Sequence, residues 1–163
     1  MIEKSQSLFI RAAGVNDAPL LLRFSRELAE YERQPGAVVI DEGTLAKDGF
    51  GDRPKFRSLI AEWDRQAIGY ALFFGIYSSC RGPAIFLEDL FVREPFRGRG
   101  IGRALLCQVA QIARQEGSYG IRWEVADWNE SAIKFYKSLG AEFLYEWRQV
   151  LLEADALNRL ADG

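Results

Sequence analysis

The chain has 163 residues, of which 48% are hydrophobic, and this is enough to bury a sizeable core, so we expect one domain spanning residues 1–163. Its 21 basic and 23 acidic residues are mixed along the chain, which disfavours a nucleic-acid role. The sequence contains no histidine, so Ser-His-Asp and Cys-His catalysis and histidine metal triads are excluded. No apolar run approaches the roughly 20 residues of a membrane helix, and we expect a cytoplasmic protein without a membrane role.

The first half of the chain predicts helices followed by an antiparallel sheet. A strand at residues 7–13 precedes an amphipathic helix that we expect to begin after Asn16, with Pro19 in its first turn, and to run to Tyr31. A short helix is predicted at residues 44–47. Alternating and apolar runs then predict strands at residues 58–63, 68–77 and 84–92, separated by short breaks.

The second half predicts a different order of elements. A helix at residues 101–116 is followed by a strand at 120–126, a helix at 130–139, a strand pair near 142–152 and a short last helix at 153–161. Strand, helix and strand in succession indicate parallel pairing through a right-handed crossover. The whole pattern is therefore that of a mixed α/β fold.

A glycine-rich turn lies between a strand and a helix, in the sequence REPFRGRGIGRALL. Gly98, Gly100 and Gly102 would allow successive backbone N–H groups to face a phosphate at the N-terminus of the helix. The turn lacks the Gly-Lys-Ser/Thr end of a Walker loop, and its glycine spacing differs from the dinucleotide fingerprint. The glycines alone do not distinguish a phosphate-binding loop from a turn that only reverses the direction of the chain.

Three further features each have a structural and a functional interpretation. Glu88 and Asp89 interrupt an apolar strand, where a carboxylate has a raised pKa and needs a reason such as a salt bridge or catalysis. Alternation places Glu88 on the face of Phe86 and Leu90, and Asp89 on the opposite face with Leu87 and Phe91. Asn129 is positioned to cap the helix at residues 130–139. Tyr136 lies on the apolar face of that helix, where core packing alone would also explain it.

The segment RGRGIG at residues 97–102 resembles the R-x-x-G-x-G/A pyrophosphate loop of the GNAT superfamily of N-acetyltransferases. FLEDLFV, ADWNESAIKFYKSLGAEF, RELAEYE and KDGFG extend the resemblance to the branch of spermidine/spermine and thialysine acetyltransferases. The resemblance implies a single GNAT-like α/β (α+β) domain. Its central mixed, twisted sheet would have an antiparallel N-terminal half, a parallel strand pair splayed at the cofactor site, and helices on both faces.

The resemblance also implies a binding site for acetyl-coenzyme A and no metal. The pantetheine arm would lie along the end of the strand at residues 84–92, the pyrophosphate in the glycine loop, and further contacts would come from the turn before the next helix. The implied cofactor-binding residues are Leu90, Phe91, Val92, Arg97, Gly98, Arg99, Gly100, Ile101, Gly102, Arg103, Asn129, Glu130, Ser131 and Ala132.

For catalysis, the resemblance implies that Glu88 takes the proton of the attacking amine, directly or through water, and that Tyr136 protonates the departing thiolate. A tyrosine hydroxyl is protonated at neutral pH, and an alkylammonium must lose a proton before it attacks, so both roles suit the chemistry. The absence of a placed cysteine nucleophile agrees with direct transfer. The implied substrate-binding residues are Tyr31, Glu32, Glu88, Asp89, Arg122, Trp123, Glu124 and Glu146.

Two departures from the polyamine-acting members affect the expected substrate. Ser78-Ser79-Cys80 stands where those members have Asp-Pro-Trp, and Glu124 stands where they have an apolar residue; Glu124 either favours a cationic ligand or pairs with Arg122 or Lys137. We therefore expect a small diamine or a lysine-like amine such as thialysine. A polyamine acetyltransferase, a silent acyl-coenzyme A sensor and a protein N-acetyltransferase are the alternatives. Members of this branch are usually homodimers, which the resemblance extends to this chain.

Overall fold

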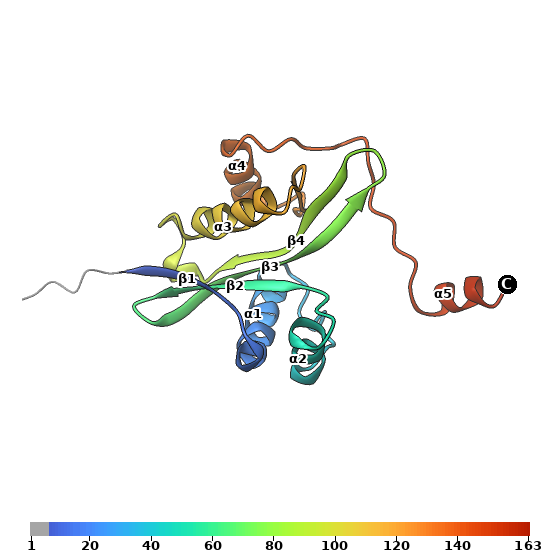
Figure 1. Ribbon diagram of the computed structural model, residues 1–163, viewed down its shortest axis with the longest axis horizontal. Coiled ribbons are helices and arrows are strands. Elements are labelled where there is room, and N and C mark those ends of the chain that lie inside the picture. The colour runs from blue at the N-terminus through green and yellow to red at the C-terminus, as the bar shows by residue number, and fades with distance from the viewer. Residues whose placement is uncertain (1–6) are drawn as a thin grey trace, which may run out of the picture. The chain divides into compact units, whose positions relative to one another are not determined.

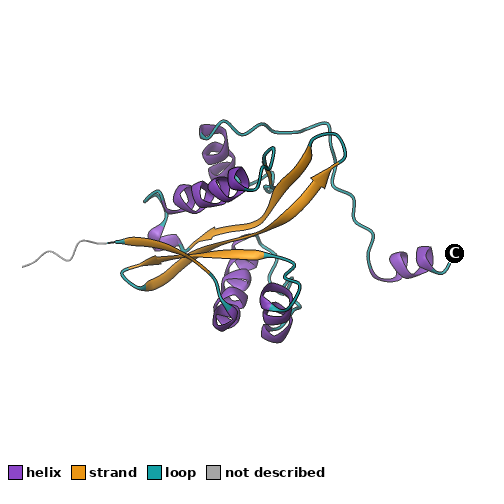
Figure 2. Cartoon of the chain, viewed as in Figure 1, coloured by secondary structure: helices purple, strands orange, loops and turns teal. Residues whose placement is uncertain are grey.

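The structure, a computed structural model, describes residues 7–163, which divide into two compact parts that meet in sequence between Glu124 and Val125 (Figure 1). The first part contains a sheet with helices on both of its faces (Figure 2). Its elements are β1 (Leu8–Ala12), α1 (Ala18–Tyr31), α2 (Glu42–Phe50), β2 (Arg57–Trp63), β3 (Gln66–Ser78), β4 (Gly82–Val92), α3 (Ile101–Gln115) and β5 (Ile121–Arg122), with 3-10 turns at Val15–Asp17 and Glu94–Phe96.

The five strands form one mixed sheet in the order β1-β2-β3-β4-β5. The first four strands pair antiparallel, and β4 pairs with β5 in parallel through Ile85↔Ile121 and Phe86↔Arg122. The predicted antiparallel half and the parallel pair after the crossover helix are both confirmed. The strand predicted at residues 120–126 is shorter than expected, because it pairs with β4 only at these two positions.

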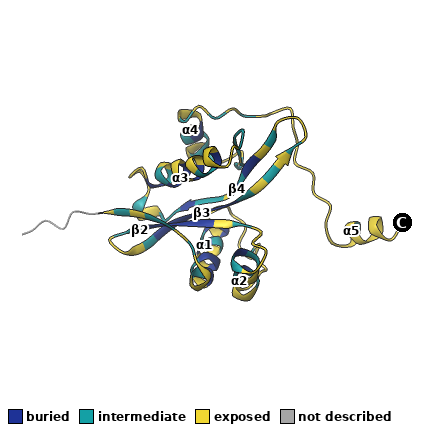
Figure 3. Ribbon diagram, viewed as in Figure 1, coloured by how far each residue is buried: buried dark blue, intermediate teal, exposed yellow. Residues whose placement is uncertain are grey.

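Helices α1 and α2 cover one face of the sheet and α3 covers the other (Figure 1). On the first face, buried side chains of α1 such as Leu21 and Phe24 pack with Tyr70, Leu72 and Phe91 from β3 and β4. The buried residues accordingly concentrate along the central strands and on the helix sides that face them (Figure 3). This layer fixes the helix end that carries Tyr31 relative to the end of β4.

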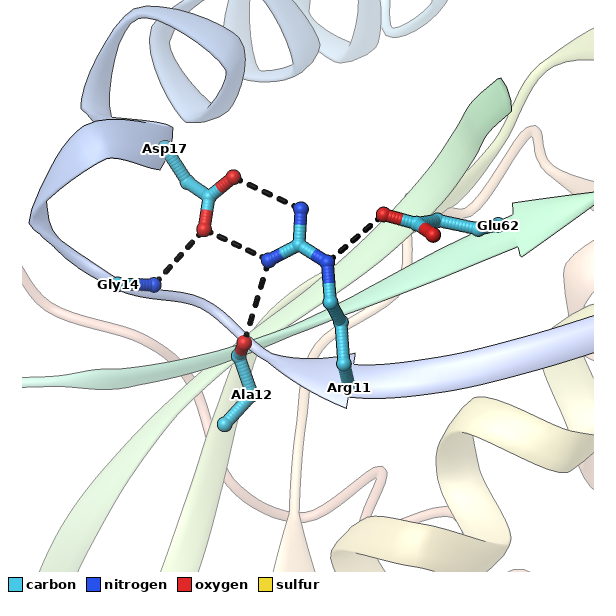
Figure 4. Close-up of polar contacts among 5 residues, drawn as sticks. All are labelled: Arg11, Ala12, Gly14, Asp17 and Glu62. Carbon is cyan, nitrogen blue, oxygen red and sulfur yellow. Dashed lines mark hydrogen bonds and ion pairs between the residues drawn. The ribbon is translucent and has the colours of Figure 1, made fainter. Parts of the chain in front are cut away.

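The start of α1 differs from the sequence expectation. A 3-10 turn occupies Val15–Asp17, and α1 begins at Ala18 with Asp17 as its N-cap residue instead of Asn16. Asp17 has other partners: its carboxylate accepts two hydrogen bonds from Arg11, at 2.7 and 2.9 Å, and one from the Gly14 amide at 2.8 Å (Figure 4). The Nε of Arg11 also donates to Glu62 at 2.7 Å, so this cluster ties the chain entering α1 to β2.

The second part contains α4 (Glu130–Ser138) and α5 (Ala154–Ala161). The strand pair predicted near residues 142–152 is wrong, because this segment has no strand in the structure. A strand requires a second backbone to satisfy its N–H and C=O groups, and apolar alternation does not reveal whether such a partner exists. The segment instead exposes large apolar side chains, with Tyr145 80% and Val150 89% exposed.

Candidate active site

A break in strand register determines where the two acids of β4 point. Leu72 pairs with Asp89 and Phe73 pairs with Leu87, so Glu88 is an extra residue without a directly opposite partner. Because directly paired residues share a face of the sheet, Asp89 lies on the face of Leu72, which packs with α1, and Leu87 lies on the other face. The expectation that Asp89 shares a face with Leu87 is therefore wrong. Bulges of this kind redirect side chains and occur often beside active sites.

Asp89 and Glu88 differ in their surroundings. Asp89 is half-buried and accepts a hydrogen bond of 2.6 Å from the hydroxyl of Tyr70, which in turn lies 3.1 Å from the hydroxyl of Ser25 in α1. Glu88 is exposed. Among residues 7–163, none of the ion pairs within 4.0 Å includes either acid, so the salt-bridge explanation of their presence does not hold.

Four carboxylates influence one another at this position. Burial, together with the charges of Glu88 and Glu32, raises the pKa of Asp89 to about 6, and the Tyr70 hydrogen bond opposes this rise. Partial desolvation of its carboxyl group and the charge of Glu124 raise the pKa of Glu88, although the residue is exposed as a whole. Partial desolvation and the charge of Glu88 raise the pKa of Glu32 in the same way. A cation brought among these carboxylates would relieve their mutual repulsion.

These electrostatic interactions connect half of the predicted substrate residues, namely Glu32, Glu88, Asp89 and Glu124. Glu32 follows the C-terminus of α1, Glu88 and Asp89 lie on β4, and Glu124 comes just after β5. The ion pairs formed among residues 7–163 do not include Glu124, so pairing with Arg122 does not account for it. Arg122 and Glu124 are exposed and Trp123 is half-buried.

The end of β4 has an edge that other strands leave open. On one side, Leu90, Phe91 and Val92 pair with β3. On the other side, the pairing with β5 ends at Phe86, so that in the part of the chain that the structure describes the later backbone of β4 has no strand partner there. Such an edge offers N–H and C=O groups to an extended ligand.

The glycine loop joins this strand end to α3. Gly98 and Gly100 have φ of 75° and 78°, which side-chain-bearing residues rarely adopt, whereas Gly102 lies within the first turn of α3 and has no positive φ. The first intrahelical bond runs from the Ala104 amide to the Gly100 carbonyl, and no side chain caps the helix, so the first amides of α3 are available to an anion. The geometry of Gly98 and Gly100 thus agrees with the expected loop, and Gly102 is not needed for the turn.

Two arginines of the loop contact the protein itself. The Nε of Arg97 donates to the Val92 carbonyl at 2.7 Å, and its guanidinium lies 4.3 Å from the centroid of the Tyr31 ring. The guanidinium of Arg99 lies 5.5 Å from the centroid of the Trp63 ring. Arg97 therefore connects the end of β4 to the end of α1, and Arg103 is exposed on α3.

The second part of the chain carries the remaining predicted residues. Asn129 caps α4, because its Oδ1 accepts a hydrogen bond of 3.1 Å from the Ala132 amide, and this confirms the structural interpretation of Asn129. Tyr136 is buried, with its ring 5.2 Å from that of Phe135. Glu146 is exposed in the irregular segment that the sequence predicts as strands.

Sequence reasoning missed Tyr70 and Ser25. In the run IGYALFF, Tyr70 looks like any aromatic residue of a buried strand, and Ser25 like a polar residue on an amphipathic helix. A hydroxyl within a fully apolar strand does require a hydrogen-bond partner, and that requirement was the available signal. Its partner could not be identified without the register of β3 against β4.

Within residues 7–163, no three or more cysteine, aspartate or glutamate side chains are grouped so as to hold a metal ion. The helices of the same residues are all too short or too polar to cross a membrane.

The sequence profile of the Acetyltransferase (GNAT) family matches residues 22–141. The chain therefore belongs to the GNAT family of acetyltransferases, and the resemblance noted from its motifs is confirmed. Thialysine N-epsilon-acetyltransferase of Sus scrofa is 40% identical over 95% of this chain and 98% of that protein. Spermidine/spermine N(1)-acetyltransferase-like protein 1 of Homo sapiens is 36% identical over 81% of this chain and 20% of that protein. Together these findings identify an N-acetyltransferase.

Solved structures share the fold. An integron cassette protein from the mobile metagenome of V. cholerae superposes with a TM-score of 0.79 at 26% identity, covering 96% of this chain and 99% of that chain. Aminoglycoside N-acetyltransferase AAC(6')-Iy, solved in complex with CoA, superposes with a TM-score of 0.73 at 20% identity, covering 95% of this chain and 99% of that chain. At this identity the second likeness concerns the fold alone.

Proposed function

We propose that this enzyme transfers an acetyl group from acetyl-coenzyme A directly to a primary amine of a small cationic substrate, with thialysine, a lysine-like amine or a short diamine favoured. The observation that carries the proposal is the register break in β4 that presents Glu88 and Asp89 beside the open edge of the strand, with the charges of Glu124 and Glu32 near enough to raise their pKa values. Substrates with an ammonium group suit such a site. The relationship to the thialysine N-epsilon-acetyltransferase of Sus scrofa supports the same substrate class.

The residues present fit acetyl-coenzyme A. The first amides of α3 and the positive φ of Gly98 and Gly100 form an N-terminal anion site suited to the pyrophosphate, with Arg97, Arg99 and Arg103 adding positive charge. The unpaired edge at Leu90, Phe91 and Val92 suits the amide groups of the pantetheine arm. Ile101 and Gly102, and separately Asn129, Glu130, Ser131 and Ala132, are proposed as further contacts of acetyl-coenzyme A.

The proposed chemistry is a single displacement. Glu88 accepts the proton that the ammonium group must lose, and the free amine nitrogen then attacks the acetyl carbonyl, for which a backbone N–H near the end of β4 provides polarisation. The carbon–sulfur bond breaks, and the hydroxyl of Tyr136 gives its proton to the thiolate. The nitrogen, now bonded to the acetyl carbon, loses its second proton through water, which restores the Tyr136 hydroxyl, and the proton held by Glu88 passes to solvent. Partial desolvation and Glu124 already raise the pKa of Glu88, which makes it a better base near neutral pH. Tyr31, Glu32, Asp89, Arg122, Trp123, Glu124 and Glu146 are the proposed substrate contacts.

A polyamine is the second candidate substrate. The relationship to the spermidine/spermine acetyltransferase-like protein of Homo sapiens favours it, whereas Ser78-Ser79-Cys80 supplies no acid for a distant ammonium group. A silent acyl-coenzyme A sensor would not need Glu88 or Tyr136, and a protein N-acetyltransferase would not need so many carboxylates for one amine. Both are therefore less well supported.

The test is release of the coenzyme A thiol from acetyl-coenzyme A with thialysine, lysine, putrescine, spermidine, spermine and a basic peptide. We expect the highest kcat/KM with thialysine or a short diamine, and a loss of about a hundredfold or more in Glu88→Gln. Glu142→Gln, an exposed acid of the second part, serves as the control and should match wild type. Preference for spermine would favour the hypothesis that the substrate is a polyamine. Full activity of Glu88→Gln would show that Glu88 is not the base.

We also propose that the enzyme is a cytoplasmic homodimer of single-domain chains, as the branch that it resembles suggests. Light scattering after size exclusion tests the assembly, and a mass near the 18.5 kDa of one chain would contradict it.

A further inference from the structure

A row of hydroxyl groups leads from α1 through β3 to the Asp89 carboxylate. The Tyr70 hydroxyl has one proton, and the 2.6 Å contact with Asp89 uses it. The Ser25 hydroxyl, 3.1 Å from the Tyr70 oxygen, must then be the donor in the contact between these two. The hydrogen bonds therefore run in one direction, from Ser25 to Tyr70 to Asp89.

Packing holds the Tyr70 ring in place independently of its hydroxyl. The side chain is fully buried, stacks on Phe24 with ring centroids 5.3 Å apart, and meets Phe91 edge-on at 6.5 Å. Burial and the neighbouring Asp89 raise the pKa of Tyr70 well above its ordinary value, so the hydroxyl remains a donor throughout the working pH range. Replacement by phenylalanine would retain the packing and remove only the two hydrogen bonds of the hydroxyl, with Asp89 and with Ser25.

Asp89, which accepts this hydrogen bond, destabilises the folded state when it is ionised. Asp89 faces Tyr70 from β3, and Glu88 and Glu32, from β4 and from the end of α1, both disfavour its charge. A residue kept only for structure gains nothing from like-charged neighbours, whereas a carboxylate kept for a cation does. A fixed orientation then matters, because a charge-assisted hydrogen bond depends on geometry.

We propose that Tyr70, oriented by Ser25, is a positioning residue for acetyl transfer: its hydroxyl fixes the Asp89 carboxylate in the orientation that binds the ammonium group of the substrate. This inference rests on the proposed function and adds two residues to it that act through Asp89. Tyr70 does not touch the reacting atoms. Its effect is on amine binding and on the pH at which Asp89 becomes ionised.

The experiment measures kcat and KM against pH for Tyr70→Phe, with the amine that wild type acetylates best. We expect KM for the amine to rise about tenfold with a much smaller change in kcat, because the lost hydrogen bond is to a charged group. The acidic limb of kcat/KM should move to higher pH, since the Tyr70 hydrogen bond lowers the pKa of Asp89. Tyr77→Phe, on the same strand and 78% exposed, is the matched control and should behave as wild type.

Two more variants separate positioning from general damage. Ser25→Ala should raise the amine KM in the same direction by about two- to fivefold, and it keeps the test decisive if Tyr70→Phe does not fold. In an Asp89→Asn background, Tyr70→Phe should cause no further rise, because the hydrogen bond then orients a neutral amide and no longer a carboxylate that binds the ammonium group. An unchanged KM and acidic limb in folded Tyr70→Phe, or an equal rise in the Asp89→Asn background, would overturn the inference and leave the proposed function intact. Absence of turnover by wild type with every amine would overturn the proposed function, and this inference with it.

Discussion

The proposed binding of an ammonium group requires Asp89 to be ionised, whereas its surroundings in the fold disfavour the ionised form. Its pKa is raised to about 6 in the folded protein, from an ordinary value of 3.8, chiefly by burial. The folded state therefore binds this proton more tightly than the unfolded state, and stability is lost as the pH rises from about 4 to about 6. Above that window, the protein carries the full cost of an ionised Asp89.

Asp89→Asn should accordingly stabilise the fold, by about 1 to 2 kcal/mol at pH 7 and by much less at pH 4. The amide oxygen can still accept the hydrogen bond from Tyr70, so packing and hydrogen bonding are retained. Denaturant unfolding at both pH values measures the effect, with the exposed Asp52→Asn as the control. A variant less stable than wild type at pH 7 would show that the charge of Asp89 supports the fold.

Arg97 contacts one residue of the proposed cofactor site and one residue of the proposed amine site. It donates to the Val92 carbonyl, at the open strand end, and lies against the ring of Tyr31, beside the amine residues. Arg97→Met should therefore raise KM for both substrates, by about three- to tenfold each. Arg99→Met should affect the KM for acetyl-coenzyme A only, because the guanidinium of Arg99 lies against the rings of Trp63 and Phe96, which are not among the proposed amine contacts. Bisubstrate initial-rate kinetics distinguishes the two patterns, and an unchanged amine KM in Arg97→Met would contradict the link.

At the scale of elements, close approach of β3 and β4 sets the strand end along which the cofactor is proposed to lie. A Cβ on Gly69 would stand 2.5 Å from the Phe91 carbonyl oxygen and 3.2 Å from the Cα of Val92. Both neighbours are backbone atoms, so they yield only if the strands separate. Gly75, on the same strand, has open space around it.

Gly69→Ala should destabilise the protein by about 1 to 3 kcal/mol and raise KM for acetyl-coenzyme A, because the strand end is displaced. Gly75→Ala provides the same change of residue without the clash and should leave both quantities near wild type. Thermal unfolding and initial rates measured on the two variants give the comparison. Equal behaviour of the two alanines would mean that β3 relaxes without moving β4.

Most elements could be predicted because their patterns are local. The apolar runs of β2 and β3 and the apolar face of α3 were sufficient to place these elements within a few residues. The extra residue at Glu88 could not be predicted, because counting alternate residues assumes one partner for each. That residue decides that Asp89 meets Tyr70, so the sequence identified the acids and missed the hydroxyl that holds one of them.

At the scale of the whole molecule, a net charge close to zero conceals a negative electrostatic field around four acids. The formal net charge is only -2, yet Glu32, Glu88, Asp89 and Glu124 act on one another at one position. Composition alone could not predict this, because the four acids come together only through the ends of α1, β4 and β5. The field should attract a substrate in proportion to its positive charge.

The amine KM should therefore depend on salt according to the charge of the substrate. Between about 0.01 M and 1 M ionic strength, the Debye length falls from about 30 Å to about 3 Å, which screens attraction beyond direct contact. For a diamine, KM should rise several-fold over this range with little change in kcat, because screening acts on binding before the chemical step. An amino alcohol of equal length, with a hydroxyl in place of the second ammonium, should respond much less. Thiol-release kinetics at fixed saturating acetyl-coenzyme A measures both substrates, and an equal salt response would mean that the four carboxylates do not act together on the second charge.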